Sequence, residues 1–161
     1  MGIFHMWLPV VEFLTGDVYF LQSNPDTTIT EPGNTPDPMT VASYNGADKS
    51  IAIDSGRGYT RGGRLKPEFA APGVDVTGAV SRGQFTKRTG SSIATGITAG
   101  ATALLFEWIV YQLGRTNIDS IQLKNLMILG TERKDTEVYP NRSWGYGSLN
   151  LYNTFEQLRT F

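Results

Sequence analysis

The chain has 161 residues, of which 40% are apolar, and this is enough to form one globular domain with a core. Fourteen Lys and Arg against fifteen Asp and Glu leave a net charge of -1, so bulk charge does not attract nucleic acid or an anionic membrane. The lack of cysteine excludes disulfides, a catalytic thiol and a thiolate–zinc site, and His5 is the only histidine.

The N-terminal residues indicate an interior segment of a longer chain. Residues 3–20 are apolar and aromatic, with Pro9 and Gly16 as interruptions, which is typical of two short strands or of a strand and a short helix. Residues 1–9 lack the basic region and the cleavage site of a secretory signal. Because an apolar strand begins almost at residue 1, we expect this chain to be the later part of a longer protein.

The middle of the chain predicts short strands between loops. Residues 24–38 contain four prolines, which is typical of a loop. Short strands are expected at residues 39–44 and 50–54, followed by an exposed loop rich in Gly and Arg at residues 55–64. Residues 74–76 are expected to be the strand that enters the core.

The last third of the chain predicts three helices. Residues 92–113 are apolar or small on nearly every face, which predicts a helix buried all round, and Gly114 ends it. The run is too interrupted by Thr, Gly and Glu to predict a membrane span. A second helix is expected from Asp119 or Ser120 to Leu129, and a third at residues 149–158. Strands that alternate with helices predict an α/β domain with part of a parallel sheet.

The strongest chemical signal is a serine at the start of the first of these helices. Residues 89–95 read TGSSIAT, a turn of small residues that delivers Ser92 to the first helical turn. A tight turn exposes the Oγ of a nucleophilic serine, and the free N–H groups of a helix N-terminus stabilise a developing oxyanion. The same position also suits a serine that only caps the helix.

Four segments together resemble one family of hydrolases. Residues 66–76 and 90–105 resemble the ordered motifs Lys-Pro-Asp-x-x-Ala-Pro-Gly and Gly-Thr-Ser-Met-Ala of the subtilisin-like serine peptidases, the subtilases. Residues 32–43 and 144–150 are similar to family segments on either side. The resemblance implies a partial subtilisin-like α/β fold, with a mostly parallel sheet flanked by helices.

Finer details resemble one branch of that family. Residues 55–61, 105–108 and 139–147 look like the clostridial subtilases that include the spore-germination proteases. In that branch a jelly-roll domain is inserted into the catalytic domain. The resemblance implies that residues 1–23 are the end of this insert and the return to the catalytic domain, that residues 24–161 are the C-terminal part of that domain, and that the parent protein is spore-associated or secreted.

The resemblance also assigns roles to individual residues. It implies that Ser92 is the nucleophile, that Gly90 and Ser91 form the nucleophile loop beside the oxyanion site, and that Pro32 borders the substrate pocket after a cis peptide bond. Subtilases place their Asp, His and oxyanion Asn well before the serine, and His5 lacks the family's His-Gly-Thr setting. We therefore expect these partners to lie in a missing N-terminal half, a parent that cleaves peptide bonds through an acyl-enzyme, and a chain that is inactive alone.

Other serine chemistries are tested by residue order. An α/β-hydrolase needs a histidine after the nucleophile, and none follows Ser92. A chymotrypsin-like order of His5, Asp54 and Ser92 requires two β-barrels. A dyad of Ser92 with Lys87 is a further alternative, although a solvated lysine is the ordinary interpretation of Lys87. The competing class is a non-catalytic scaffold or pseudoprotease that binds a peptide or regulates a partner.

The sequence also bears on ligands and partners. The basic residues Arg57, Arg61, Arg64 and Lys66 favour a solvated loop over a contact with an acidic substrate or propeptide. The Asp and Asn residues of 24–37 have no specific calcium spacing, so we predict no metal and no cofactor. The expected partners are a peptide or protein substrate and the missing half of the domain. The open sheet edge left by that half predicts self-association of the chain alone.

Overall fold

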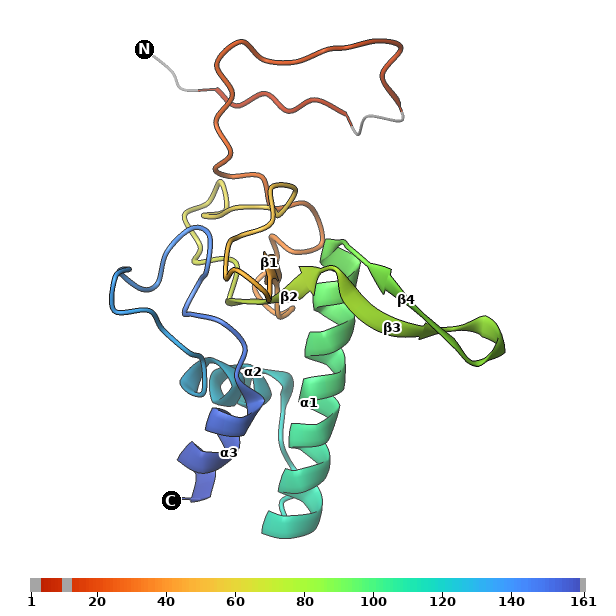
Figure 1. The fold of residues 1–161 in the computed structure, drawn as a ribbon. Helices are drawn as coiled ribbons and strands as arrows, with labels where there is room; N and C mark the ends of the chain where they lie inside the picture. Colours follow the sequence, from red (N-terminus) through yellow and green to blue (C-terminus); the bar gives the residue numbers. More distant parts are fainter. Residues whose placement is uncertain (1–3, 10–12, 160–161) are drawn as a thin grey trace.

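The computed structural model describes residues 4–9 and 13–159, which fold around a small parallel sheet and one long helix (Figure 1). Strands β1 (Val41–Asn45) and β2 (Phe69–Val74) pair in parallel, with Ala42 opposite Ala70. Strands β3 (Val76–Val80) and β4 (Gln84–Arg88) form a separate antiparallel hairpin. The helices are α1 (Ser91–Leu113), α2 (Ser120–Leu129) and α3 (Leu151–Arg159). The predicted α/β class is confirmed.

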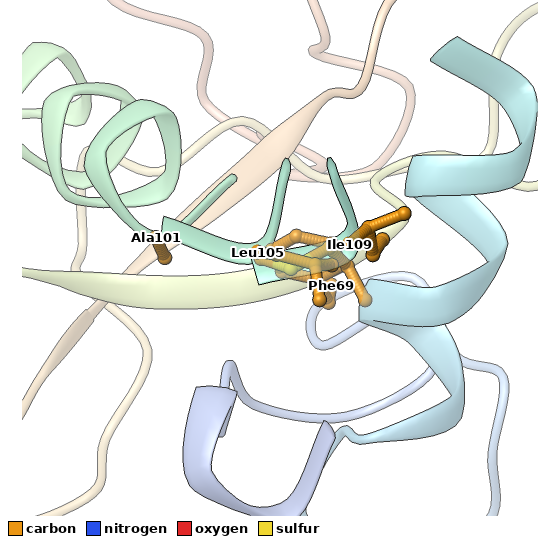
Figure 2. Packing of buried hydrophobic residues seen from close by; sticks show 5 residues of the cluster. Phe69, Ala101, Leu105 and Ile109 are labelled. Atoms are coloured by element: carbon orange, nitrogen blue, oxygen red, sulfur yellow. The ribbon is translucent and has the colours of Figure 1, made fainter. Parts of the chain in front are cut away.

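The core lies between α1 and the parallel sheet. Ala94, Thr98, Ala101, Leu105 and Ile109 are the buried residues of α1, and their spacing of three or four residues places them in one stripe. This stripe packs against β1 and β2, and α2 and α3 flank it. Figure 2 shows how the side chain of Phe69 from β2 meets those of α1.

The expectation that α1 is buried on every face is wrong. Leu104 is 56% exposed and Phe106 is 43% exposed, because the described residues contact only one side of the helix. By length and composition alone α1 would suit a membrane span, a criterion that core helices of soluble proteins also meet. Its packed stripe identifies it as the core helix of this domain.

The two neighbouring leucines of α1 give a direct test of this packing. Leu105 is fully buried, so Leu105→Ala is expected to lower the free energy of unfolding by about 2–5 kcal/mol. Leu104→Ala removes the same atoms from a side chain that is largely exposed, and we expect a loss of about 0.5 kcal/mol or less. Urea denaturation followed by tryptophan fluorescence measures both variants. Equal losses would contradict the one-sided packing of α1.

The second helix begins as the sequence predicts. The carboxylate of Asp119 accepts a hydrogen bond from the backbone N–H of Gln122 at 2.7 Å, and the Gln122 side chain accepts one from the N–H of Asp119 at 3.1 Å. This reciprocal capping box satisfies two donors that the helix leaves free. The third predicted helix is present as α3, and Gly114 adopts the left-handed conformation that ends α1.

Two predictions of strands are corrected. Residues 50–54 contribute only an isolated bridge between Ile51 and Tyr44, because a turn follows at once. Of residues 3–20, positions 3 and 10–12 lie outside the described residues, and the described remainder contains no strand. A strand needs a neighbour to satisfy its N–H and C=O groups. Residues 50–52 meet β1 only over a short stretch, and the described part of residues 3–20 has no partner strand.

The strand that enters the core is β2, and the prediction of residues 74–76 for this role is wrong. Phe69, Ala70 and Ala71 are fully buried, whereas Asp75 has a φ of 52° and breaks the strand. From Val76 the chain leaves the body of the molecule as the exposed hairpin β3–β4 (Figure 1). The change of direction occurs at a residue type that tolerates positive φ better than most.

The outer edge of β1 is partly covered. The residues of β1 that face away from β2 bond to the following loop: Asn45 N–H donates to Ser50 O at 2.8 Å, and Ser43 O accepts from Ala52 N–H at 2.9 Å. Residues 50–52 therefore cover one part of the predicted open edge, the part from Ser43 to Asn45. Self-association through the rest of this edge stays a prediction.

Candidate active site

The predicted nucleophile loop, Gly90 and Ser91, is fixed to the end of β2. The N–H of Gly90 donates to the carbonyl oxygen of Gly73 at 2.8 Å, and Gly90 has a φ of 151°, which favours glycine. The helix α1 starts at the next residue and places Ser92 on its first turn, where the side chain is exposed. The Oγ of Ser92 has no hydrogen-bond partner among the described residues. Ser92 is therefore a free hydroxyl at a helix N-terminus.

The backbone around Ser92 suits an oxyanion. The first N–H groups of an α-helix have no acceptor within the helix, and Gly90 at the N-cap provides no side chain to satisfy them. The N–H groups of Ser91 and Ser92 have no acceptor in the described part of the chain. They are thus available to a negatively charged oxygen, and the helix dipole adds to the attraction.

The loop rests on a close approach of small residues. Gly73 is buried, and a Cβ at this position would overlap the Oγ of Ser43 and lie 2.9 Å from the carbonyl oxygen of Gly90. It would also lie 3.2 Å from the Cβ of Ala94 in α1. The missing side chain of Gly73 is therefore what allows β1, β2 and the nucleophile loop to meet.

A groove of about 620 Å³ adjoins the nucleophile loop. Its walls combine apolar side chains with hydroxyl groups and two carboxylates, and Ser91 and Thr95 come from the first turns of α1. Pro32, which the sequence analysis places at the border of the substrate pocket, lines the same groove after a cis peptide bond with Glu31. The structure therefore brings Pro32 and Ser91 to one groove, immediately beside Ser92.

Residues of the alternative serine mechanisms are not assembled with Ser92. His5 is exposed and stacks on the ring of Trp7, with 5.6 Å between ring centroids. Asp54 lines the groove but makes no hydrogen bond to a histidine. Lys87 is an exposed residue of β4 with no bond to Ser92 in the described structure. The described residues form no β-barrel, so the chymotrypsin-like arrangement does not apply.

The basic stretch around residues 57–66 is only partly a solvated loop. Arg61 and Arg64 are exposed, as expected, but Ser55 and Thr60 are buried, and Lys66 is only 2% exposed. The interpretation of Lys66 as a solvated cation is wrong, because its amine lies 2.7 Å from a carboxylate oxygen of Glu68. Sequence analysis missed this pair, because the composition of the loop does not indicate that the side chains of Lys66 and Glu68 are buried.

Comparison with known proteins gives a consistent result. The model of the subtilase family matches residues 15–147. Serine protease AprX of Bacillus subtilis is 29% identical over 154 residues, which cover 82% of this chain and 33% of AprX. C5a peptidase of Streptococcus pyogenes is 32% identical over 98 residues, which cover 61% of this chain and 8% of that peptidase.

Similarity of structure agrees with similarity of sequence. The CspB protease of Clostridium perfringens superposes with a TM-score of 0.81 and 32% identity, over 88% of this chain and 31% of CspB. The chain thus spans about a third or less of the length of each of these relatives. Because the family model matches well over half of the residues, and the fold agrees, this chain belongs to the subtilase family of serine proteases.

Proposed function

We propose that this chain contributes the nucleophile and one wall of the substrate groove to a subtilisin-like serine endopeptidase. The observation that supports it is the position of Ser92, an exposed hydroxyl on the first turn of α1 beside a groove that Ser91 and Pro32 line. A scissile peptide in this groove would place its carbonyl carbon against the Oγ of Ser92.

The proposed reaction is acyl transfer in two steps. The Oγ of Ser92 attacks the carbonyl carbon while a histidine base accepts its proton, and the carbonyl oxygen becomes an oxyanion that the N–H of Ser92 stabilises. The histidine then protonates the leaving amine, which departs and leaves an acyl group on Ser92. Water, activated by the same histidine, releases the second product and restores the serine.

The base, its orienting aspartate and the oxyanion asparagine are proposed to lie outside these 161 residues. His5 is stacked on Trp7, and no described side chain accepts the proton of Ser92. The exposed apolar side chains Leu104 and Phe106 of α1 suit contact with the segment that carries these groups. We therefore propose that the chain has no peptidase activity alone, and the assignment to the spore-germination branch stays a prediction.

One gel tests the proposed function. A lysate of the native source is treated with a fluorescent fluorophosphonate, the protein is captured with an antibody to this chain, and size and label are read together. We expect a labelled band well above 17.7 kDa, the mass of this chain, and no label when the gene carries Ser92→Ala. An unlabelled band at 17.7 kDa would instead indicate a non-catalytic scaffold that binds a peptide or regulates a partner.

A further inference from the structure

We propose that Lys66, Glu68 and Lys124 form a positioning cluster that holds one wall of the substrate groove in place. The wall is residues 32–40, which precede β1. The proposal rests on the proposed function for its consequence in catalysis, but the cluster itself is defined by contacts within this chain.

The cluster joins three parts of the fold through one carboxylate. Glu68 precedes β2, and its Oε1 lies 2.7 Å from the amine of Lys66 and 3.5 Å from the amine of Lys124 in α2. Its Oε2 accepts a hydrogen bond from the backbone N–H of Thr40 at 2.7 Å. The backbone N–H of Glu68 also donates to the carbonyl oxygen of Thr40 at 2.8 Å.

Both lysines also bind the backbone of the same wall. The amine of Lys66 donates to the carbonyl oxygen of Pro38 at 2.6 Å, and that of Lys124 donates to the carbonyl oxygen of Pro36 at 3.1 Å. Carbonyl oxygens of proline-rich segments are not satisfied by a regular strand or helix. The cluster supplies charged donors to two of them and so fixes the backbone between them.

Because the three charged side chains are buried, loss of any of these contacts is costly in free energy. The side chains of Lys66, Glu68 and Lys124 are 2%, 6% and 14% exposed. A buried charge that loses its partner is strongly unfavourable, because water cannot replace the lost contacts. Movement of the wall away from Glu68 would break the Thr40 and Pro38 contacts together. The cluster therefore opposes displacement of the wall more than neutral hydrogen bonds would.

The wall connects the charged cluster to residues that line the groove. Pro38 and Thr40 line the groove directly. The Oγ1 of Thr40 also donates to the carbonyl oxygen of Gly33 at 2.8 Å, and Gly33 lines the groove next to Pro32. A continuous path thus runs from Glu68 through Thr40 to the proline that borders the groove. Since none of the three charged residues lines the groove, their role is to position residues that do.

Hydrogen exchange on the 161-residue chain tests the positioning directly. Glu68→Gln removes the negative charge, and we expect amide exchange in residues 33–40 to rise about 10- to 100-fold, as loss of a hydrogen bond to a charged group predicts. Exchange in α3 is expected to stay unchanged. Glu156→Gln is the matched control, because it removes a carboxylate from an exposed pair with Arg159 and should leave residues 33–40 unaffected.

A milder pair of variants keeps the test valid if Glu68→Gln does not fold. Lys124→Met retains the length of the side chain but removes its donors to Pro36 and Glu68. We expect faster exchange in residues 33–40 with Lys124→Met and near-normal exchange with Lys124→Arg. Unchanged exchange in a folded Glu68→Gln or Lys124→Met variant would overturn the positioning cluster.

Kinetics of the full-length peptidase separate positioning from general stability. With dye-quenched casein as the substrate, Lys124→Met is expected to raise KM about tenfold and to change kcat less than about twofold, as loss of substrate alignment without loss of catalytic groups predicts. A KM equal to that of the unmodified enzyme would overturn the catalytic part of the proposal. Absence of any Ser92-dependent hydrolysis would instead contradict the proposed function, while hydrogen exchange would still decide whether the cluster holds the wall.

Discussion

Under the proposed function, replacing Ser92 with alanine is expected to lower the kcat of the full-length peptidase by about 10⁶-fold, the size of the effect when a subtilisin loses its nucleophile. Under the proposed function, Ser92→Ala removes the oxygen that would form the acyl-enzyme, while the hydroxyl of the neighbouring Ser91 is left in place. Hydrolysis of dye-quenched casein measures the loss, and the extent of fluorophosphonate labelling measures the nucleophile directly. The exposed position of Ser92 predicts that the melting temperature stays nearly the same.

The control for this prediction is Ser81→Ala. Ser81 is also exposed and lies in the turn between β3 and β4. It is expected to retain full labelling and full turnover. A folded Ser92→Ala variant with normal hydrolysis would show that a different residue forms the covalent intermediate.

A large loss of stability is expected from Gly73→Ala, which adds a single methyl group. The added Cβ would overlap the Oγ of Ser43 and crowd the carbonyl oxygen of Gly90 at 2.9 Å. Rotation of the Ser43 side chain can relieve the first contact, but relief of the second requires β2 and the nucleophile loop to move apart, which strains the hydrogen bond from Gly90 N–H to Gly73 O. We expect a loss of about 3 kcal/mol in the free energy of unfolding of this chain, at the upper end of typical overpacking effects.

A neighbouring glycine gives the matched control for Gly73→Ala. Gly78 lies in β3, and a Cβ built on it meets no atom within 4 Å. Gly78→Ala is therefore expected to be neutral or slightly stabilising, since alanine restricts the unfolded chain. Urea denaturation of both variants measures the difference. Equal stabilities for Gly73→Ala and Gly78→Ala would contradict the close approach of β2 and the nucleophile loop.

Features that depend on neighbouring residues were predicted well from the sequence. The cap of α2 uses Asp119 and Gln122, which are three residues apart, so the pattern itself contains both partners. The turn before α1 and the stop at Gly114 are equally local. The same holds for the place of Ser92 at the helix start, whereas its role as nucleophile came from the family resemblance and remains a proposal.

Features that depend on distant residues were missed or misread. Lys66 reads as one of four basic loop residues, and its burial becomes clear only when Lys124 and the carbonyl groups of residues 36–38 are placed around Glu68. The stripe that α1 buries cannot be found from its composition, because nearly all of its faces are apolar. Only the contacting elements decide which face is covered, and these are separate segments of the chain, β1, β2, α2 and α3.

The two ends of the hairpin β3–β4 are joined by hydrogen bonds where the hairpin leaves the domain. The carbonyl oxygen of Gly73 and the N–H of Gly90 are bonded at its base, and the N–H of Asp75 donates to the Oγ1 of Thr89 at 2.9 Å. Because the two ends are joined there, we expect changes in length at the exposed tip of residues 81–83 to leave the distance between β2 and α1 unchanged. We therefore expect that the hairpin can be lengthened by evolution, or can receive a grafted epitope at its tip, without a displacement of Ser92.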